Sequence, residues 1–235
     1  MLSCPATAAL VGGTLEVSGA GCRFPDVAYG SVSRQFLVVW ADYNGVPRIS
    51  GRLVRGDGSY AGGVFGISDA DKGSLYPAVA FNPASNEFLV TWDDTDARGG
   101  VIVGQRVRGS DGALMGTNFS IGAHFGGIRS AVAWSPPSAC YLVTYFVPGA
   151  TAEIFGQRVS SSGSLTGSNF NISNDAIFSG YPAVAWGTAS NEFLVTWDNE
   201  DGNIHARRVN ASTGALVGTT IIATTGGAKD RSCVA

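Results

Sequence analysis

A segment of nineteen residues occurs twice in this chain with few changes, as YPAVAFNPASNEFLVTWDD from Tyr76 and as YPAVAWGTASNEFLVTWDN from Tyr181. Two weaker copies, FPDVAYGSVSRQFLVVWAD from Phe24 and RSAVAWSPPSACYLVTYFV from Arg129, complete a set of four. The aromatic residue near the end of each copy recurs at intervals of 52, 53 and 52 residues, as Trp40, Trp92, Tyr145 and Trp197. A fixed period in this range is typical of a solenoid, a propeller or an array.

Each repeat divides into four short strands, here called a to d in chain order. In the second repeat we expect strand a at residues 77–81, strand b at 87–92, strand c at 101–107 and strand d at 117–122. The connections are rich in Gly, Pro, Ser and Asn, which form turns. The chain has 33 glycines and only 14% charged residues, a composition that suits many short strands joined by tight turns.

The burial pattern of strand b favours stacked sheets. FLVTW is apolar on both faces, whereas a strand in a single sheet with one wet face alternates apolar and polar residues. Four-stranded sheets stacked around an axis cover both faces, as in a β-propeller. Small residues such as Ala78 and Ala80 suit strand a as the innermost strand, and bulky Phe88 and Trp92 suit the middle of a blade. The predicted fold class is therefore all-β, a propeller of four-stranded blades of about 52 residues.

The repeats define the domain organisation. We predict a single propeller domain over residues 1–235, whose ends belong to a split blade. LVGGTLEVSG, from Leu10 to Gly19, is interpreted as a strand d, and RSCVA, from Arg231, matches the strand a that begins RSAVA at Arg129. The chain then either closes a five-bladed ring with a depleted fifth blade or is a fragment of a longer array. The predicted segments are 1–20 (terminal strand d), 21–72, 73–125, 126–177 and 178–226 (four complete repeats) and 227–235 (start of the next repeat).

The four cysteines lack metal-ligand spacing such as C-x-x-C. A disulfide from Cys4 or Cys22 to Cys233 would support ring closure, and buried free thiols are the alternative. The net charge of −3 gives no electrostatic footprint for nucleic acid. No apolar run reaches the roughly 18 residues of a membrane span.

The repeat pattern YPAVA(F/W), NEFLVTW, GQRV and NF.IS resembles repeats of secreted or surface-located bacterial propeller proteins, over residues 24 to 223. It is also distantly similar to the blades of sialidase-like, carbohydrate-active propellers. The sialidase pattern S-x-D-x-G-x-x-x-W is missing from every repeat, and an arginine triad cannot be assigned. The resemblance therefore implies an extracellular or cell-surface binding or scaffold propeller, and it supplies no catalytic residue.

Acidic residues gather in the predicted d-to-a and b-to-c loops, which lie at one rim of such a propeller. Calcium takes six to eight oxygen ligands from carboxylates and carbonyls on flexible loops. DDTDARGG and DNEDGN offer such oxygens without the D-x-D-x-D-G spacing, and acidic turn formers exposed to solvent are the alternative. Calcium is the one cofactor considered, and its predicted ligands are Asp93, Asp94, Asp96, Asp198, Glu200 and Asp201.

One position of strand c holds a long polar side chain in every repeat. In a groove between blades these residues could grip a sugar at several equivalent sites and so give avidity. Alternatively, they are structural and pair with loops across the edge of the blade. The predicted ligand-binding residues are Arg52, Gln105, Gln157 and Arg207.

The sequence thus predicts a non-enzymatic extracellular propeller that binds a carbohydrate or another cell-surface ligand. A glycoside hydrolase that uses two rim carboxylates is an alternative, for which Asp94 or Asp198 would be tested by substitution. A structural array that holds further repeats or domains apart is the third possibility.

Overall fold

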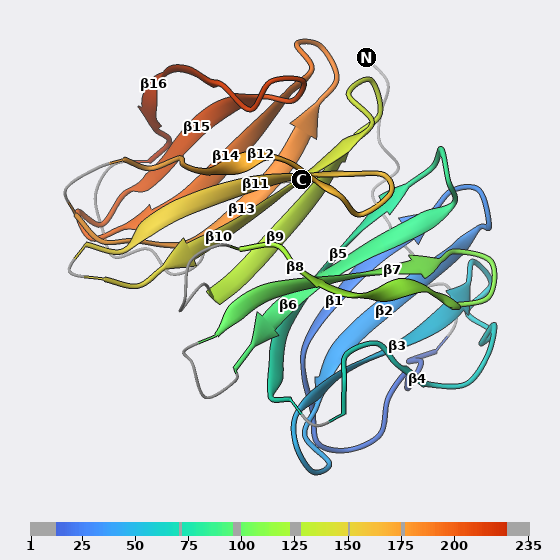
Figure 1. Cartoon of the computed structure of the whole chain (residues 1–235). Helices are drawn as coiled ribbons and strands as arrows, with labels where there is room; N and C mark the ends of the chain where they lie inside the picture. Colours follow the sequence, from blue (N-terminus) through green and yellow to red (C-terminus); the bar gives the residue numbers. More distant parts are fainter. Residues whose placement is uncertain are drawn as a thin grey trace.

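Strand b of the second repeat is buried along its whole length, which explains why its sequence is apolar on both faces. A computed structural model of the chain describes residues 13–70, 72–95, 100–122, 128–149, 151–174 and 177–224. These residues form four separate antiparallel sheets of four strands each, one per repeat, and no helix among the residues described (Figure 1). The predicted propeller architecture is confirmed.

The sheets follow the order of the chain, and we call them blades 1 to 4. Figure 1 shows β1, β5, β9 and β13 toward the middle of the molecule and β4 and β16 on the outside. The strands are β1 (Cys22–Gly30), β2 (Gln35–Asp42), β3 (Arg48–Arg55) and β4 (Phe65–Gly66) in blade 1; β5 (Ser74–Asn82), β6 (Glu87–Asp94), β7 (Val101–Arg108) and β8 (Leu114–Ser120) in blade 2; β9 (Ile128–Ser135), β10 (Cys140–Val147), β11 (Glu153–Ser160) and β12 (Leu165–Asn171) in blade 3; β13 (Ser179–Gly187), β14 (Glu192–Asn199), β15 (Ile204–Asn210) and β16 (Leu216–Ile222) in blade 4.

Neighbouring blades pack face to face along the array. The innermost strands contact one another in the order β1, β5, β9, β13. Between blades 1 and 2, Leu37 and Val39 pack against Phe88, Val90 and Trp92 in one apolar cluster. Similar clusters fill the next two interfaces. The core is therefore divided among the inter-blade spaces, and each interface is built from equivalent positions.

A glycine in strand c makes room for this packing. A Cβ atom on Gly51, Gly104 or Gly156 would lie 2.7–2.9 Å from the Cδ1 atom of a buried isoleucine in strand d or just after it. Those isoleucines are Ile67, Ile121 and Ile172, each no more than 1% exposed. Blade 4 has alanine at both positions: Ala206 replaces the glycine, and Ala223 replaces the isoleucine. The glycine and the isoleucine of this contact are therefore present together in blades 1 to 3 and replaced together in the last blade.

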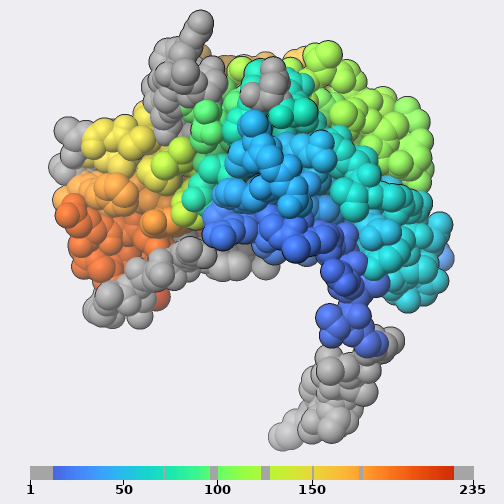
Figure 2. All heavy atoms as spheres, turned by 90° about the horizontal axis from the view of Figure 1, so that it is seen from below, coloured from blue at the N-terminus to red at the C-terminus, as the bar shows by residue number. Residues whose placement is uncertain are grey.

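The two outer faces of the array lack the cover that the inner faces have. Val27 and Tyr29 of blade 1 are 54% and 47% exposed, whereas the equivalent Val79 of blade 2 is 7% exposed. At the other end Ile221 and Ile222 of blade 4 are 46% and 52% exposed. Figure 2, viewed from below, shows that blade 1 (blue) and blade 4 (orange to red) both reach the surface. The outer faces of the two end blades thus expose apolar side chains of the kind that the inner faces bury.

The chain ends and strand boundaries differ from the sequence prediction. Residues 13–20 form no strand, so the prediction of a terminal strand d was wrong for the part of that segment that the structure describes. Residues 1–12 and 225–235 lie outside the described residues. Strand d of blade 1 has only two residues.

Cys22 and Cys140 are free thiols, and Cys4 and Cys233 lie outside the described residues. The described residues include no helix of the length and hydropathy required to cross a membrane.

Candidate functional site

Each innermost strand begins with a bulge that has the same unusual backbone conformation. Phe24, Tyr76, Arg129 and Tyr181 have φ angles of 53°, 50°, 52° and 53°, in the left-handed region. The pairing of strands a and b shifts register at this point in every blade. A left-handed conformation costs a residue other than glycine roughly 1–2 kcal/mol. Strain of this kind often lies at functional sites, where the surrounding structure enforces it.

The four bulge residues form a continuous stack around the axis. The ring centroids of Phe24 and Tyr76 are 4.3 Å apart. The guanidinium carbon of Arg129 lies 4.1 Å from the centroid of the Tyr76 ring and 4.8 Å from that of the Tyr181 ring. We call Phe24, Tyr76, Arg129 and Tyr181 the axial ring. It joins all four blades at the end where the d-to-a and b-to-c loops lie.

A cavity of about 400 Å³ opens beside the axial ring. Such a volume lies within the roughly 300–1,000 Å³ of typical ligand pockets, which combine aromatic walls with a few polar groups. No ion pair joins Arg129 to a carboxylate among the described residues. The cavity is lined by Phe24, Pro25, Asp26, Tyr76, Pro77, Ala78, Arg129, Ser130 and Ala131.

Two carboxyl groups near the axial ring each accept a backbone amide of the next blade. Asp93 accepts hydrogen bonds from the backbone amide of Arg129 with both oxygens, at 2.8 and 3.0 Å. Burial raises the pKa of Asp93 to about 8, although the hydrogen bond from Arg129 and the positive charge of Arg129 partly oppose this shift. Asp26 accepts the backbone amide of Val79 at 2.8 Å, and burial raises its pKa. Both carboxylates therefore connect one blade to the next.

The predicted metal ligands do not gather at one place. Asp93 faces blade 3, whereas Asp94, the next residue along the strand, lies near Lys72 of the loop before β5, 3.8 Å from Nζ. A lysine ammonium beside Asp94 disfavours a bound cation there by charge repulsion. Asp96 lies outside the described residues. No group of three or more His, Cys, Asp or Glu residues that could hold a metal occurs in the described ranges.

The blade 4 acids are engaged locally and lie two blades away from Asp93 and Asp94. Asp201 accepts the backbone amide of Asn203 at 2.9 Å and contacts Nε2 of His205 at 2.9 Å. Desolvation acts to raise the pKa of Asp201, but the hydrogen bonds with Asn203 and His205 outweigh it and lower the pKa. Asp198 pairs with Gly180 across the sheet, and the backbone amide of Glu200 donates to the carbonyl of Phe178. The calcium site stays a prediction.

The four predicted sugar-binding residues do share one register position, opposite Val38, Val90, Val143 and Val195 of strand b. The side chains of Gln105 and Gln157, however, are 1% exposed. The Gln105 amide donates to the carbonyl oxygens of Arg106 and Met115, and the Gln157 amide donates to those of Arg158, Thr166 and Gly167. These amides connect strand c to the bulge of strand d.

The two arginines at this position have different partners. Arg52 lies over the ring of Tyr60, with 3.3 Å between its guanidinium carbon and the ring centroid, and donates to the carbonyl of Gly62. Arg207 donates to the hydroxyl of Thr220 at 3.2 Å. These hydrogen bonds of the four residues are all made within their own blades, and none of the four residues lines the axial cavity.

Comparison with known proteins agrees with the fold. No protein-family model matches the chain, and no curated protein matches it. A thermostable family-43 glycoside hydrolase has 13% identity and a TM-score of 0.57, over 89% of this chain and 75% of that one. A Hadza microbial sialidase has 10% identity and a TM-score of 0.67, over 87% of this chain and 47% of that one.

A third similar structure is the endo-arabinase from Bacteroides thetaiotaomicron, with 12% identity and a TM-score of 0.59, over 90% of this chain and 84% of that one. This chain spans about half the length of the sialidase. At such low identities the similarity concerns the path of the backbone. The chain therefore has a β-propeller fold of the kind found in carbohydrate-active enzymes.

Proposed function

We propose that the protein binds a saccharide at the axial cavity, without hydrolysing it, and acts outside the cell or at the cell surface. The observation that carries the proposal is the position of Arg129 between the rings of Tyr76 and Tyr181. Phe24, Tyr76 and the neighbouring prolines give the cavity wall apolar surface against which C–H groups of a sugar can pack, and the planar guanidinium donates paired hydrogen bonds to hydroxyl or carboxylate oxygens. The saccharide-processing enzymes with similar folds support this class of ligand.

The carboxylates near the cavity support binding over catalysis. Glycoside hydrolysis ordinarily requires two carboxyl groups that flank the scissile bond. Among the residues that the structure describes, Asp26 is the only carboxylate that lines the axial cavity. Asp93 is fully buried behind the ring, with both of its oxygens occupied by the amide of Arg129.

A hydrolase is the second candidate, because Asp26 lines the cavity and has a raised pKa. A carboxyl group that stays protonated is the form a general acid needs. Hydrolysis would require a second carboxylate on the opposite side of the bound sugar. Release of sugar from aryl glycosides, lost in Asp26→Asn but retained in Glu16→Gln, would favour this candidate.

The decisive test is Arg129→Lys, which keeps the charge but removes the planar group with its paired donors. We expect affinity for glycans identified on an array to fall at least tenfold, with an unchanged melting temperature. Arg52→Lys is the matched control, because Arg52 also stacks on a tyrosine, outside the axial cavity. Equal affinity of Arg129→Lys and the wild type would contradict the proposal. Repeating the array with calcium and with EDTA tests the predicted calcium requirement.

A further inference from the structure

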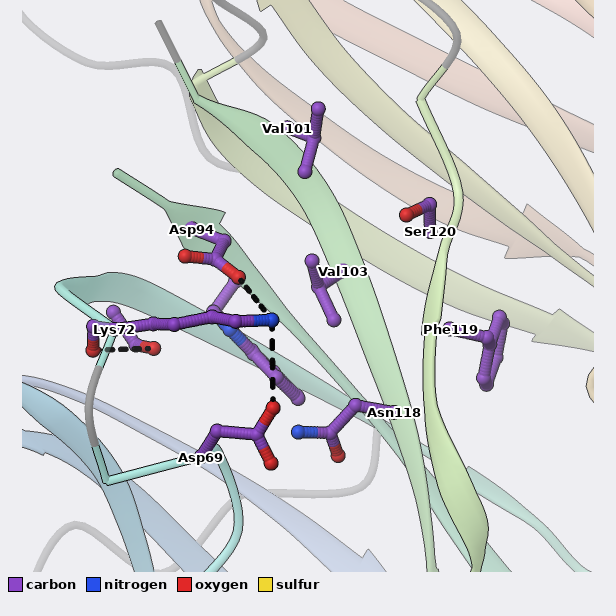
Figure 3. A pocket seen from close by; sticks show the side chains of 10 residues that line it. Asp69, Lys72, Asp94, Val101, Val103, Asn118, Phe119 and Ser120 are labelled. Carbon is purple, nitrogen blue, oxygen red and sulfur yellow. Dashed lines mark hydrogen bonds and ion pairs between the residues drawn. The ribbon is translucent and has the colours of Figure 1, made fainter. Parts of the chain in front are cut away.

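A second cavity, of about 190 Å³, lies between blades 1 and 2. The loop before β5 forms one wall, and strands β6, β7 and β8 form the other (Figure 3). We call it the inter-blade cavity. It is lined by Asp69, Lys72, Ser74, Trp92, Asp94, Val101, Val103, Asn118, Phe119 and Ser120, and it shares no residue with the axial cavity.

Trp92 brings a buried donor without a partner to this cavity. Its side chain is 1% exposed, and its indole N–H has no hydrogen-bond partner among the described residues. An unsatisfied buried donor costs about 1–3 kcal/mol. An acceptor atom inside the cavity would remove that cost. A ligand hydroxyl and an ordered water are the two acceptors that fit a polar cavity open to solvent.

The charges at the cavity select the chemistry of the ligand. Lys72 Nζ lies 3.5 Å from Asp69 and 3.8 Å from Asp94, so the ammonium bridges the two carboxylates. Figure 3 shows these contacts, with the amide of Asn118 directed at the same space. A bare cation would meet Lys72, and an anion would meet the two carboxylates. Donors and acceptors that alternate around a small space suit the hydroxyl groups of a neutral polyol.

The volume limits the size of the ligand. Pockets for drug-sized molecules measure roughly 300–1,000 Å³, and this one is smaller. Val101, Val103 and Phe119 add apolar surface beside the polar groups. We propose that the inter-blade cavity binds a single neutral monosaccharide unit. One of its hydroxyls accepts the hydrogen bond of Trp92, and others contact Lys72, Asp69 and Asn118. This site is independent of the axial cavity.

The test follows the indole N–H signals of the five tryptophans by ¹H–¹⁵N correlation NMR. The probes are the methyl glycosides of galactose, glucose, mannose, fucose and arabinose. We expect the Trp92 signal to shift saturably with at least one of them, in the millimolar range. Trp40 is the matched internal control, because its indole N–H is also buried and unpartnered, but Trp40 does not line the inter-blade cavity.

Three variants sharpen the result. Trp92→Phe keeps an aromatic ring but removes both the donor and its signal, so its affinity is measured on the glycoside by saturation-transfer NMR and should weaken about tenfold, whereas Trp40→Phe should bind as the wild type does. Lys72→Met should also weaken binding while the Trp92 signal stays observable. Arg129→Lys should leave the Trp92 response unchanged, which separates this site from the axial cavity. A Trp92 signal indifferent to all five glycosides, or one that moves only as Trp40 does, would overturn the proposal and leave a water-filled cavity.

Discussion

The carboxylate of Asp93 in blade 2 accepts the backbone amide of Arg129 in blade 3 with both oxygens, at 2.8 and 3.0 Å. A buried carboxyl group of one repeat thus fixes the backbone of the strained residue that begins the next. Because Asp93 is fully buried, this contact connects the stability of the propeller to the protonation of a single carboxyl group.

Asp93→Asn should flatten the dependence of stability on pH. The folded pKa is about 8 and the ordinary value is 3.8. Between these values the unfolded chain has lost the proton that the folded protein still holds, so stability falls as pH rises. One pKa unit corresponds to about 1.4 kcal/mol, so the fall is at most about 6 kcal/mol. Asparagine carries no titrating carboxyl group, so the variant should not lose stability over this pH range. Urea unfolding at pH 5, 6.5 and 8 measures it, and parallel wild-type and variant curves would refute the assignment.

Phe36 and Phe88 occupy equivalent positions, but only Phe88 is covered by a preceding blade. Phe88 is fully buried and Phe36 is 36% exposed. Phe88→Ala should lower the free energy of unfolding by about 3–5 kcal/mol. Phe36→Ala should lower it by less than half as much, because part of that ring already contacts water. Denaturant titration of both variants compares the costs, and equal losses would mean that the outer face of blade 1 is covered in solution.

Ala139 offers a stabilising substitution in the turn between strands a and b. Arg34, Asn86, Ala139 and Asn191 all have φ between 48° and 55°. Asparagine tolerates this left-handed conformation better than alanine does. Ala139→Asn should therefore raise the free energy of unfolding by about 0.5–1 kcal/mol. Ala113→Asn, at a residue that itself has no positive φ, is the control and should bring no such gain; a destabilised Ala139→Asn would contradict the argument.

Gln157→Leu distinguishes a structural role from a binding role for the strand c position. The substitution removes the acceptor of the Asn169 amide and the donor to three carbonyl oxygens. Loss of a buried hydrogen-bond network of this kind should cost about 1–3 kcal/mol of stability. Glycan affinity should not change, because Gln157 does not line the axial cavity. Differential scanning calorimetry measures the first quantity and isothermal titration calorimetry the second. A loss of affinity at unchanged stability would restore Gln157 to the ligand site.

The repeat pattern predicted much of the fold because each blade is built from local signals. Turn residues separate the strands, alanines mark the innermost strand, and the apolar run around Trp92 requires cover on both faces. The axial ring was missed. A Tyr-Pro pair before alternating small residues indicates only where a strand begins, and no local signal reveals a positive φ at Tyr76.

The individual site residues could not be predicted for a related reason. The partner of Asp93 is a backbone amide 36 residues away in another blade, and the ammonium beside Asp94 comes from the loop before β5, so the local sequence around these two acids reveals neither contact. Gln105 and Gln157 recur at one position whether they bind a ligand or hold strand d. The recurrence therefore identified this strand c position, but it could not distinguish a ligand-binding role from a structural one.

The axial ring has one further consequence, for how such a chain changes over time. Each repeat contributes one side chain, read in order as Phe, Tyr, Arg and Tyr, on a backbone that has nearly the same φ in all four repeats. Duplication or exchange of a whole repeat would therefore replace one member of the ring and keep its backbone in place. A tandem array of this kind can acquire a new ligand preference by exchanging complete repeats. A site assembled from unrelated segments cannot change in this way.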